Sequence, residues 1–235
     1  MIIERPFALR GEVALDWLHS RHTFSFGHYY DPAWMGFGVL RVINDDSVAP
    51  GGGFAPHRHA NMEIISVVLE GALAHKDSAG HSGVIRAGDV QWMSAGHGIE
   101  HSEYNASQTE SVHFLQLWIQ PERLNHQPAY DQKHFSLDAR RGRWCVVASP
   151  DGAAGAIAIR QQATLAITHL QPGDALEVVL EASKRYWLHV ASGEVMLDAR
   201  ALSAGDALGF VEETGALTLR GVAASSDVLL FTLPA

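Results

Sequence analysis

The stretch AGHGIEHSEYN, residues 95–105, contains two overlapping metal-ligand patterns, and the choice between them decides the fold. His97, Glu100 and His101 form H-x-x-E-H, a zinc-protease pattern that requires an α-helix. His101 and Glu103 form H-x-E, which on a β-strand directs both side chains to the same side. The two patterns therefore predict different folds around a metal ion.

The neighbouring residues favour the strand. Gly96 and Gly98 lie beside and inside the helical pattern, and each costs a helix about 1 kcal/mol relative to alanine. The preceding segment DVQWMSA, residues 89–95, has no apolar stripe at helical spacing and is typical of a strand. We therefore expect a strand that carries His101 and Glu103 on one face.

Short apolar segments with turn residues at their ends run through the whole chain. They are rich in β-branched and aromatic residues, which is typical of a β-sandwich or β-barrel. In the first half they cover residues 37–45, 62–71, 72–80, 89–96 and 111–121. The best candidate for a helix, residues 12–20, is short. The pattern predicts an all-β protein.

Two landmarks recur in the same order in the two halves. A strand ends at Gly71 and again at Gly193, and each is followed by a hairpin and then by the turn AGD, at residues 87–89 and 204–206. Matched order over this length is typical of an internal repeat. The sequence therefore predicts two β-barrels in tandem.

A polar segment rich in turn residues, 122–150, is expected to connect the two barrels. We place the domain boundary within it. The predicted domains are an N-terminal metal-binding domain, residues 1–130, and a C-terminal domain without metal ligands, residues 131–235.

A second pair of histidines, His57 and His59, follows a glycine-rich turn at the start of an apolar strand. On an extended chain their side chains point to the same face. Histidines with one carboxylate suit a divalent transition metal with open coordination positions. Strand parity allows either Glu63 or Glu103 to supply that carboxylate, and spacing alone leaves both open.

The second half has no comparable set of ligands. It contains no H-x-H, and His169 and His189 stand alone in apolar strands, where a packed core histidine is expected. We therefore predict one metal site, in the N-terminal barrel only.

Several other polar residues are candidates for smaller roles. His97 and His113 could line the metal pocket. His22 is expected to make a buried polar contact, and Asn-Asp-Asp at residues 44–46 is expected to form a turn.

Composition excludes some functions. The net charge is −9 and no cluster of basic residues exceeds two, so a direct nucleic-acid interface is not expected. The start of the chain does not resemble a signal peptide, and no run of about 18 apolar residues could span a membrane. A cytoplasmic protein is expected.

Several long stretches resemble the pirin family of the cupin superfamily, whose members contain two cupin barrels. They are DWLHSRHTFSFGHYYDP, RVINDD, HRHANMEIISVVLEG, DSAGHSGVIRAGDVQWMSAGHGIEHSEYN and LQLWIQP. These stretches cover nearly all of the N-terminal half, and the first cupin motif corresponds to Gly51 through Glu63.

The resemblance implies a set of ligands and a metal. Pirins typically hold iron with three histidines and the glutamate of H-x-E, which implies His57, His59, His101 and Glu103 here, with Glu63 nearby but not bound to the metal. One divalent metal ion is therefore expected, Fe(II), with other divalent metals as alternatives.

The resemblance also implies an activity. Pirins of this type resemble quercetin 2,3-dioxygenases, which use O₂ to open the ring of a flavonol and release carbon monoxide. Glu103 would both bind the metal and accept the proton of the flavonol 3-hydroxyl. The alternative is a non-catalytic pirin that acts as a redox-sensitive regulator through contacts with a protein partner.

Overall fold

The computed structural model describes residues 1–235 and divides them into two compact units. The N-terminal unit comprises residues 11–134 and 159–161. The C-terminal unit comprises residues 1–10, 135–158 and 162–235. The only α-helix is α1 (Leu137–Arg140), so the predicted all-β fold is confirmed.

The N-terminal unit contains two β-sheets. A seven-stranded sheet has the order β12-β9-β6-β11-β4-β3-β2, and a four-stranded sheet has the order β5-β10-β7-β8. The strands are β2 (Gly11–Ala14), β3 (Leu18–His22), β4 (Leu40–Val48), β5 (Gly53–His59), β6 (Glu63–Glu70), β7 (Ala72–Asp77), β8 (Ser82–Arg86), β9 (Asp89–Ser94), β10 (Ile99–Asn105), β11 (Val112–Ile119) and β12 (Ala129–His134).

The C-terminal unit has the same two kinds of sheet. A seven-stranded sheet has the order β1-β20-β17-β22-β15-β13-β14, and a four-stranded sheet has the order β16-β21-β18-β19. The strands are β1 (Ile2–Arg5), β13 (Cys145–Ser149), β14 (Ile157–Ala158), β15 (Thr164–Leu170), β16 (Ala175–Leu180), β17 (Lys184–Ser192), β18 (Glu194–Leu197), β19 (Arg200–Ser203), β20 (Ala207–Val211), β21 (Gly215–Gly221) and β22 (Ser226–Pro234).

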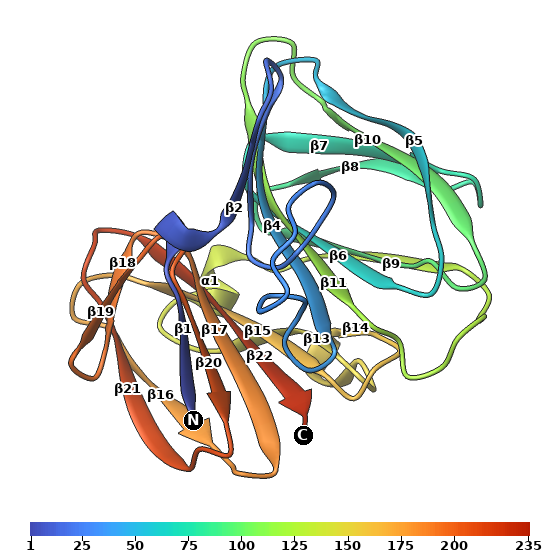
Figure 1. The fold of residues 1–235 in the computed structure, drawn as a ribbon. Helices are drawn as coiled ribbons and strands as arrows, with labels where there is room; N and C mark the ends of the chain where they lie inside the picture. The colour runs from blue at the N-terminus through green and yellow to red at the C-terminus, as the bar shows by residue number, and fades with distance from the viewer. The chain divides into compact units, whose positions relative to one another are not determined.

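The two units exchange short segments, so a single cut at residue 130 does not describe them. The first strand of the chain, β1, lies beside β20 (Figure 1) and pairs antiparallel with it, with Ile2 opposite Phe210. Residues 159–161 belong to the N-terminal unit, where the Arg160 carbonyl accepts a hydrogen bond from the Glu122 N–H.

The predicted repeat is visible in the turns. Gly71 and Gly193 both have φ of 75°, a left-handed conformation that favours glycine. In each AGD turn the aspartate carboxylate accepts a 2.9 Å hydrogen bond from a backbone N–H three residues earlier, Asp89 from Arg86 and Asp206 from Ser203. The two halves therefore repeat the same strand-turn-strand units.

Two local expectations from the sequence are wrong. Residues 12–20 form the hairpin of β2 and β3, because Leu18 is buried in the core and β3 pairs with β4. Asn44, Asp45 and Asp46 lie inside β4 and form no turn, because β4 pairs with β3 on one side and β11 on the other.

The apolar residues of the two units cluster differently. The C-terminal unit has one cluster of fourteen buried apolar residues, built around Leu188, Val190 and Phe210. The N-terminal unit has two smaller apolar clusters, one around Phe114 and Leu73 and the other around Ile64 and Met93. No helix in the structure has the length and apolar character of a membrane span.

Candidate metal site

The two histidine motifs meet across neighbouring strands. β5 and β10 pair antiparallel with His57 opposite His101 and His59 opposite Ile99. Residues directly opposite one another in such a pair place their side chains on the same face of the sheet. The predicted strand at His101 and the shared face of the two motifs are therefore both present.

The three imidazoles form a compact cluster. One ring nitrogen from each of His57, His59 and His101 lies within 4.8 Å of the others. The Nε2 atoms of His59 and His101 are 2.9 Å apart. Adjacent nitrogen ligands held about 2.1 Å from one metal ion lie about 3 Å apart, so this spacing fits a metal site.

The electrostatics of the cluster also suit a metal. Burial, assisted by the neighbouring imidazoles, lowers the pKa of His59 to about 4 and the pKa of His101 to about 3. Both rings are therefore neutral at pH 7. Neutral imidazole is the form that binds metals, because its unprotonated nitrogen has a free lone pair.

Glu103 lies two residues beyond His101 on β10, and its side chain is buried. One carboxylate oxygen lies 4.0 Å from His101 Nε2. Gln116 Nε2 donates a 2.7 Å hydrogen bond to this carboxylate, and Ser66 Oγ donates a longer one of 3.5 Å. Burial raises the pKa of Glu103 to about 7, and the two hydrogen bonds lower it only in part.

Glu63 lies on β6, on the opposite face of the seven-stranded sheet from Ser66, the residue that hydrogen-bonds to Glu103. Its carboxylate accepts hydrogen bonds from Trp92 Nε1 at 2.8 Å and from Ser94 Oγ at 2.6 Å. Asn61, between β5 and β6, has φ of 55°, so the chain turns and the strand alternation from His59 does not continue to Glu63. The choice of Glu103 rather than Glu63 as the ligand stays a prediction.

His97 and His113, the other two candidates, are not members of the histidine cluster, although His97 lines a second cavity together with His59. His97 is exposed, and its Nε2 lies 3.1 Å from Gln127 Oε1. His113 Nε2 lies 2.6 Å from Asp45 Oδ1, on the other face of β11 from Gln116 by strand alternation. Burial opposes protonation of His113, but the hydrogen bond to Asp45 and the nearby carboxylates outweigh it and raise the pKa of His113.

A cavity of about 260 Å³ opens beside the histidines and Glu103. Its apolar wall includes Phe26, Phe54 and Trp118. The Trp118 ring lies edge-on to His59 at 4.8 Å and to Phe26 at 5.2 Å. Strand parity alone could not distinguish Trp118 as a cavity wall from an ordinary core residue.

The same cavity has a polar side that sequence reasoning did not assign to the site. Ser20 and His22 on β3, and Asn44 and Asp46 on β4, line it and are all buried. The sequence does contain a pattern that indicates this polar side, since Asn44 and Asp46 have the spacing of two side chains on one face of a strand. The interpretation of residues 44–46 as a turn concealed it.

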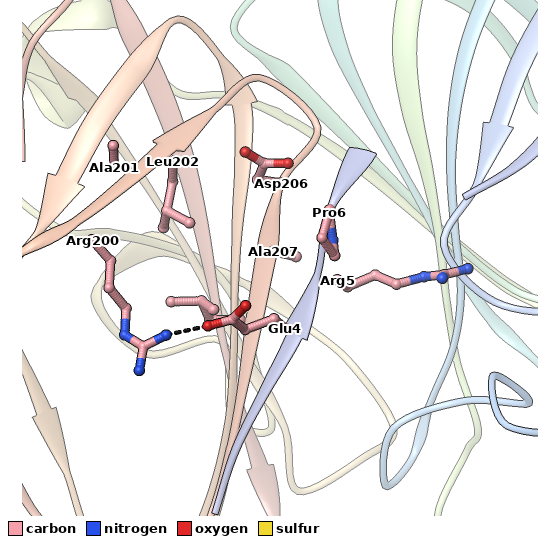
Figure 2. Close-up of a pocket in the computed structure, with 9 residues that line it drawn as sticks. Glu4, Arg5, Pro6, Arg200, Ala201, Leu202, Asp206 and Ala207 are labelled. Carbon is pink, nitrogen blue, oxygen red and sulfur yellow. Dashed lines mark hydrogen bonds and ion pairs between the residues drawn. The ribbon is translucent and has the colours of Figure 1, made fainter. Parts of the chain in front are cut away.

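The C-terminal unit has no such cluster. Its lone histidines are packed in the core: His169 Nδ1 lies 3.2 Å from Asp227 Oδ1, and His189 Nδ1 lies 3.0 Å from Arg10 Nη2. A cavity of about 300 Å³ in this unit contains no histidine (Figure 2). Glu4 and Arg200 form an ion pair in it, and Asp206 accepts hydrogen bonds within its own turn and from Phe7 N–H.

Comparison with known proteins agrees with this architecture. The Pirin family model matches residues 6–119, and the model of the quercetinase C-terminal cupin domain matches residues 146–233. The chain is 42% identical over 234 residues to a quercetin 2,3-dioxygenase of Escherichia coli K12, covering 100% of this chain and 99% of that one. It is 40% identical over 214 residues to a pirin-like protein of Caulobacter vibrioides, covering 91% of this chain and 92% of that one.

Solved structures show the same relationship. The E. coli bacterial pirin YhhW in complex with nickel(II) superimposes with a TM-score of 0.92 at 40% identity, covering 100% of this chain and 99% of that one. Identity at this level over the full length of both chains extends the likeness beyond the fold. The chain belongs to the pirin family and consists of two cupin-type domains.

Proposed function

We propose that this protein is a metal-dependent dioxygenase that opens the ring of flavonols such as quercetin, with release of carbon monoxide. His57, His59, His101 and Glu103 would hold one divalent metal ion, Fe(II) in the native protein. The observation that carries the proposal is the buried carboxylate of Glu103 beside three clustered imidazoles, at the wall of a cavity lined with aromatic rings.

A bound divalent metal ion with open positions would supply the site at which a chelating substrate and dioxygen come together. The protein residues supply the proton chemistry. A buried carboxylate at the wall of the cavity can accept a proton from a bound hydroxyl, and such general-base catalysis contributes typically 10²–10⁴-fold in rate. Glu103 would accept the proton of the flavonol 3-hydroxyl.

Neighbouring side chains position this base. Trp118 Nε1 lies 3.3 Å from Gln116 Oε1 and donates a hydrogen bond to it. The amide group of Gln116 is thereby oriented with its NH₂ toward Glu103, to which it donates the 2.7 Å hydrogen bond. The same Trp118 ring packs against His59, so one side chain supports both the metal cluster and the base.

The test is a turnover assay with protein loaded anaerobically with Fe(II), then exposed to air with quercetin. We expect loss of the flavonol absorbance together with carbon monoxide in the headspace. Glu103→Gln with its metal restored should lose this activity. Glu63→Gln is the matched control, because Glu63 is an equally buried glutamate of the same unit on the opposite sheet face.

A binding-only pirin that regulates a protein partner would bind the metal and give no turnover. Fully metallated wild-type protein that consumes no more quercetin than free metal does, with each of several divalent metals, would overturn the proposed activity. Retention of full activity in metallated Glu103→Gln would overturn only the role of the base.

A further inference from the structure

Four polar residues form one continuous patch on the cavity wall, which we call the β3/β4 polar wall: Ser20, His22, Asn44 and Asp46. Ser20 lies opposite Asp46, and His22 lies opposite Asn44, in the antiparallel pairing of β3 and β4. All four side chains therefore share one face, and all four line the cavity that also contains His57, His59 and Glu103. None of the four is used in the proposed reaction.

Three side-chain atoms of the wall are buried without a hydrogen bond of good geometry. One of them, Ser20 Oγ, interacts with the neighbouring Asp46 carboxyl, which leaves two atoms without any partner. They are Nδ1 of His22 and Oδ1 of Asn44, on residues that are only 5% and 2% exposed. Buried polar atoms without partners destabilise a folded protein, and most are paired in native structures. Two such atoms, on residues paired opposite each other at the wall of a cavity, indicate that a ligand supplies the missing partner.

The wall offers hydrogen-bond acceptors. The amide oxygen of Asn44 can only accept. Burial lowers the pKa of His22, so its ring is neutral and one ring nitrogen holds a hydrogen. The ring makes a hydrogen bond to the backbone of Phe26, in which a ring N–H donates to the carbonyl oxygen. Because Nδ1 has no partner, the donor is Nε2, and Nδ1 is left as the acceptor. The complementary ligand group is a hydroxyl donor.

We propose that the β3/β4 polar wall is the specificity-determining part of the substrate site, and that His22 and Asn44 accept hydrogen bonds from phenolic hydroxyls on the part of the substrate remote from the metal. The preferred substrate is then a polyhydroxylated aromatic compound rather than one with the chelating group alone. This inference rests on the proposed flavonol site, and it adds which groups of the substrate are recognised.

The experiment measures anaerobic equilibrium binding to Ni(II)-substituted full-length protein, so that affinity is separated from turnover. The probes are quercetin, galangin, which lacks the two hydroxyls of the pendant ring, and 3-hydroxyflavone, which has only the chelating group. One hydrogen bond between neutral groups changes affinity about two- to tenfold. For wild-type protein we expect quercetin to bind at least about tenfold more tightly than 3-hydroxyflavone.

The variants remove the acceptors and keep the shape of the wall. In Asn44→Leu, His22→Phe and the double variant, the preference for quercetin over 3-hydroxyflavone should fall to within about threefold, while the affinity for 3-hydroxyflavone stays close to wild type. Melting temperatures are measured alongside to confirm that the variants are folded, since His22→Phe also removes the hydrogen bond of the ring to the Phe26 backbone. Asp45→Asn is the matched control, since Asp45 lies between Asn44 and Asp46 on the opposite face of β4.

Each outcome has a distinct meaning. Equal affinity of wild-type protein for all three probes, or an unchanged preference in the double variant, overturns the recognition by His22 and Asn44 and leaves the proposed dioxygenase intact. Selective binding of quercetin without any oxygen-dependent turnover of the Fe(II) protein supports the recognition and overturns the dioxygenase. Failure of all three probes to bind overturns both.

Discussion

The same pair of strands has opposite chemistry in the two units. In the N-terminal unit, β5 and β10 place His57 opposite His101. In the C-terminal unit, β16 and β21 occupy the same position in the four-stranded sheet and place Leu176 opposite Leu219. Leu219 belongs to the large apolar cluster of that unit, and Leu176 packs against it.

The difference between these two strand pairs shows that the fold and the metal site depend on different features of the sequence. Both units have a seven-stranded and a four-stranded sheet in equivalent orders, although the face that β16 and β21 present to the interior is apolar and the corresponding face of β5 and β10 contains imidazoles and the Glu103 carboxyl. Strand pairing and turns are therefore sufficient for the fold. The polar interior of the N-terminal unit is a cost to stability that a metal and a substrate would offset.

Among substitutions in the N-terminal site, we expect the largest effect on the rate of turnover. Replacing Glu103 by Gln removes the base while it keeps the size of the side chain and its contacts with Gln116 and Ser66. We expect kcat for quercetin to fall by about 10²–10⁴-fold at equal metal content. Steady-state kinetics on metal-quantified protein measures this, and a loss below about fivefold would contradict the role of Glu103.

Introducing a histidine into the C-terminal unit and removing one from the N-terminal unit should change the free energy of unfolding by unequal amounts. Leu219→His puts an unpartnered imidazole at a fully buried position, and we expect a loss of about 3 kcal/mol in unfolding free energy. His101→Leu in metal-free protein should change that free energy by about 1 kcal/mol or less, because an apolar group replaces a buried polar one and His59, which loses its contact with His101, is only half-buried and can bond to water. Urea unfolding of both variants checks this, and equal losses would show that the contrast has no energetic basis.

The polar interior should also make stability depend on pH. Burial raises the pKa of Asp46 to about 7 from a usual value of 3.8. Between these values the folded protein binds more protons than the unfolded chain, so this group's contribution to stability is full below about pH 4 and is lost as the pH rises to about 7.

Asp46→Asn should remove that dependence. The unfolding free energy of metal-free variant, relative to wild type, should increase between pH 5 and pH 7 by up to about 1.4 kcal/mol per pH unit. Urea unfolding at pH 5, 6 and 7 measures the difference. Profiles that run parallel for the two proteins would mean that Asp46 is ionised in the fold at all three values.

Much of the fold could be predicted from the sequence, because turn chemistry and strand alternation are local. Equivalent turns of the two units are marked by Gly71 and Gly193 and by the two AGD sequences. These turns need a left-handed glycine and an aspartate that accepts a backbone hydrogen bond, so their residue types are visible in the sequence. The exchanged segments could not be predicted. The pairing of β1 with β20 joins residues about 200 positions apart, and no local pattern in Ile2–Arg5 specifies that partner.

The histidines of the candidate site could also be predicted from the sequence, but the choice of carboxylate could not. The i,i+2 spacing of His57 with His59 and of His101 with Glu103 indicated two strand faces, and the register of β5 and β10 brings them together. The parity argument could not separate Glu63 from Glu103, because the turn at Asn61 lies between the histidine strand and Glu63.

The β3/β4 polar wall was missed for a different physical reason. Asn, Asp and Asp in succession favour turns in general, and only the pairing of β4 with two neighbouring strands keeps residues 44–46 extended. Tertiary pairing overrode the local preference there.

The central claim is that one unit binds the metal and the other does not. Elemental analysis of untagged protein, saturated with Fe(II) or Ni(II) and then desalted, tests it most directly, together with the same measurement on His101→Leu. We expect at most one equivalent per chain for wild type and close to none for the variant. Two tightly held equivalents in wild type, or one equivalent retained by His101→Leu, would contradict the claim.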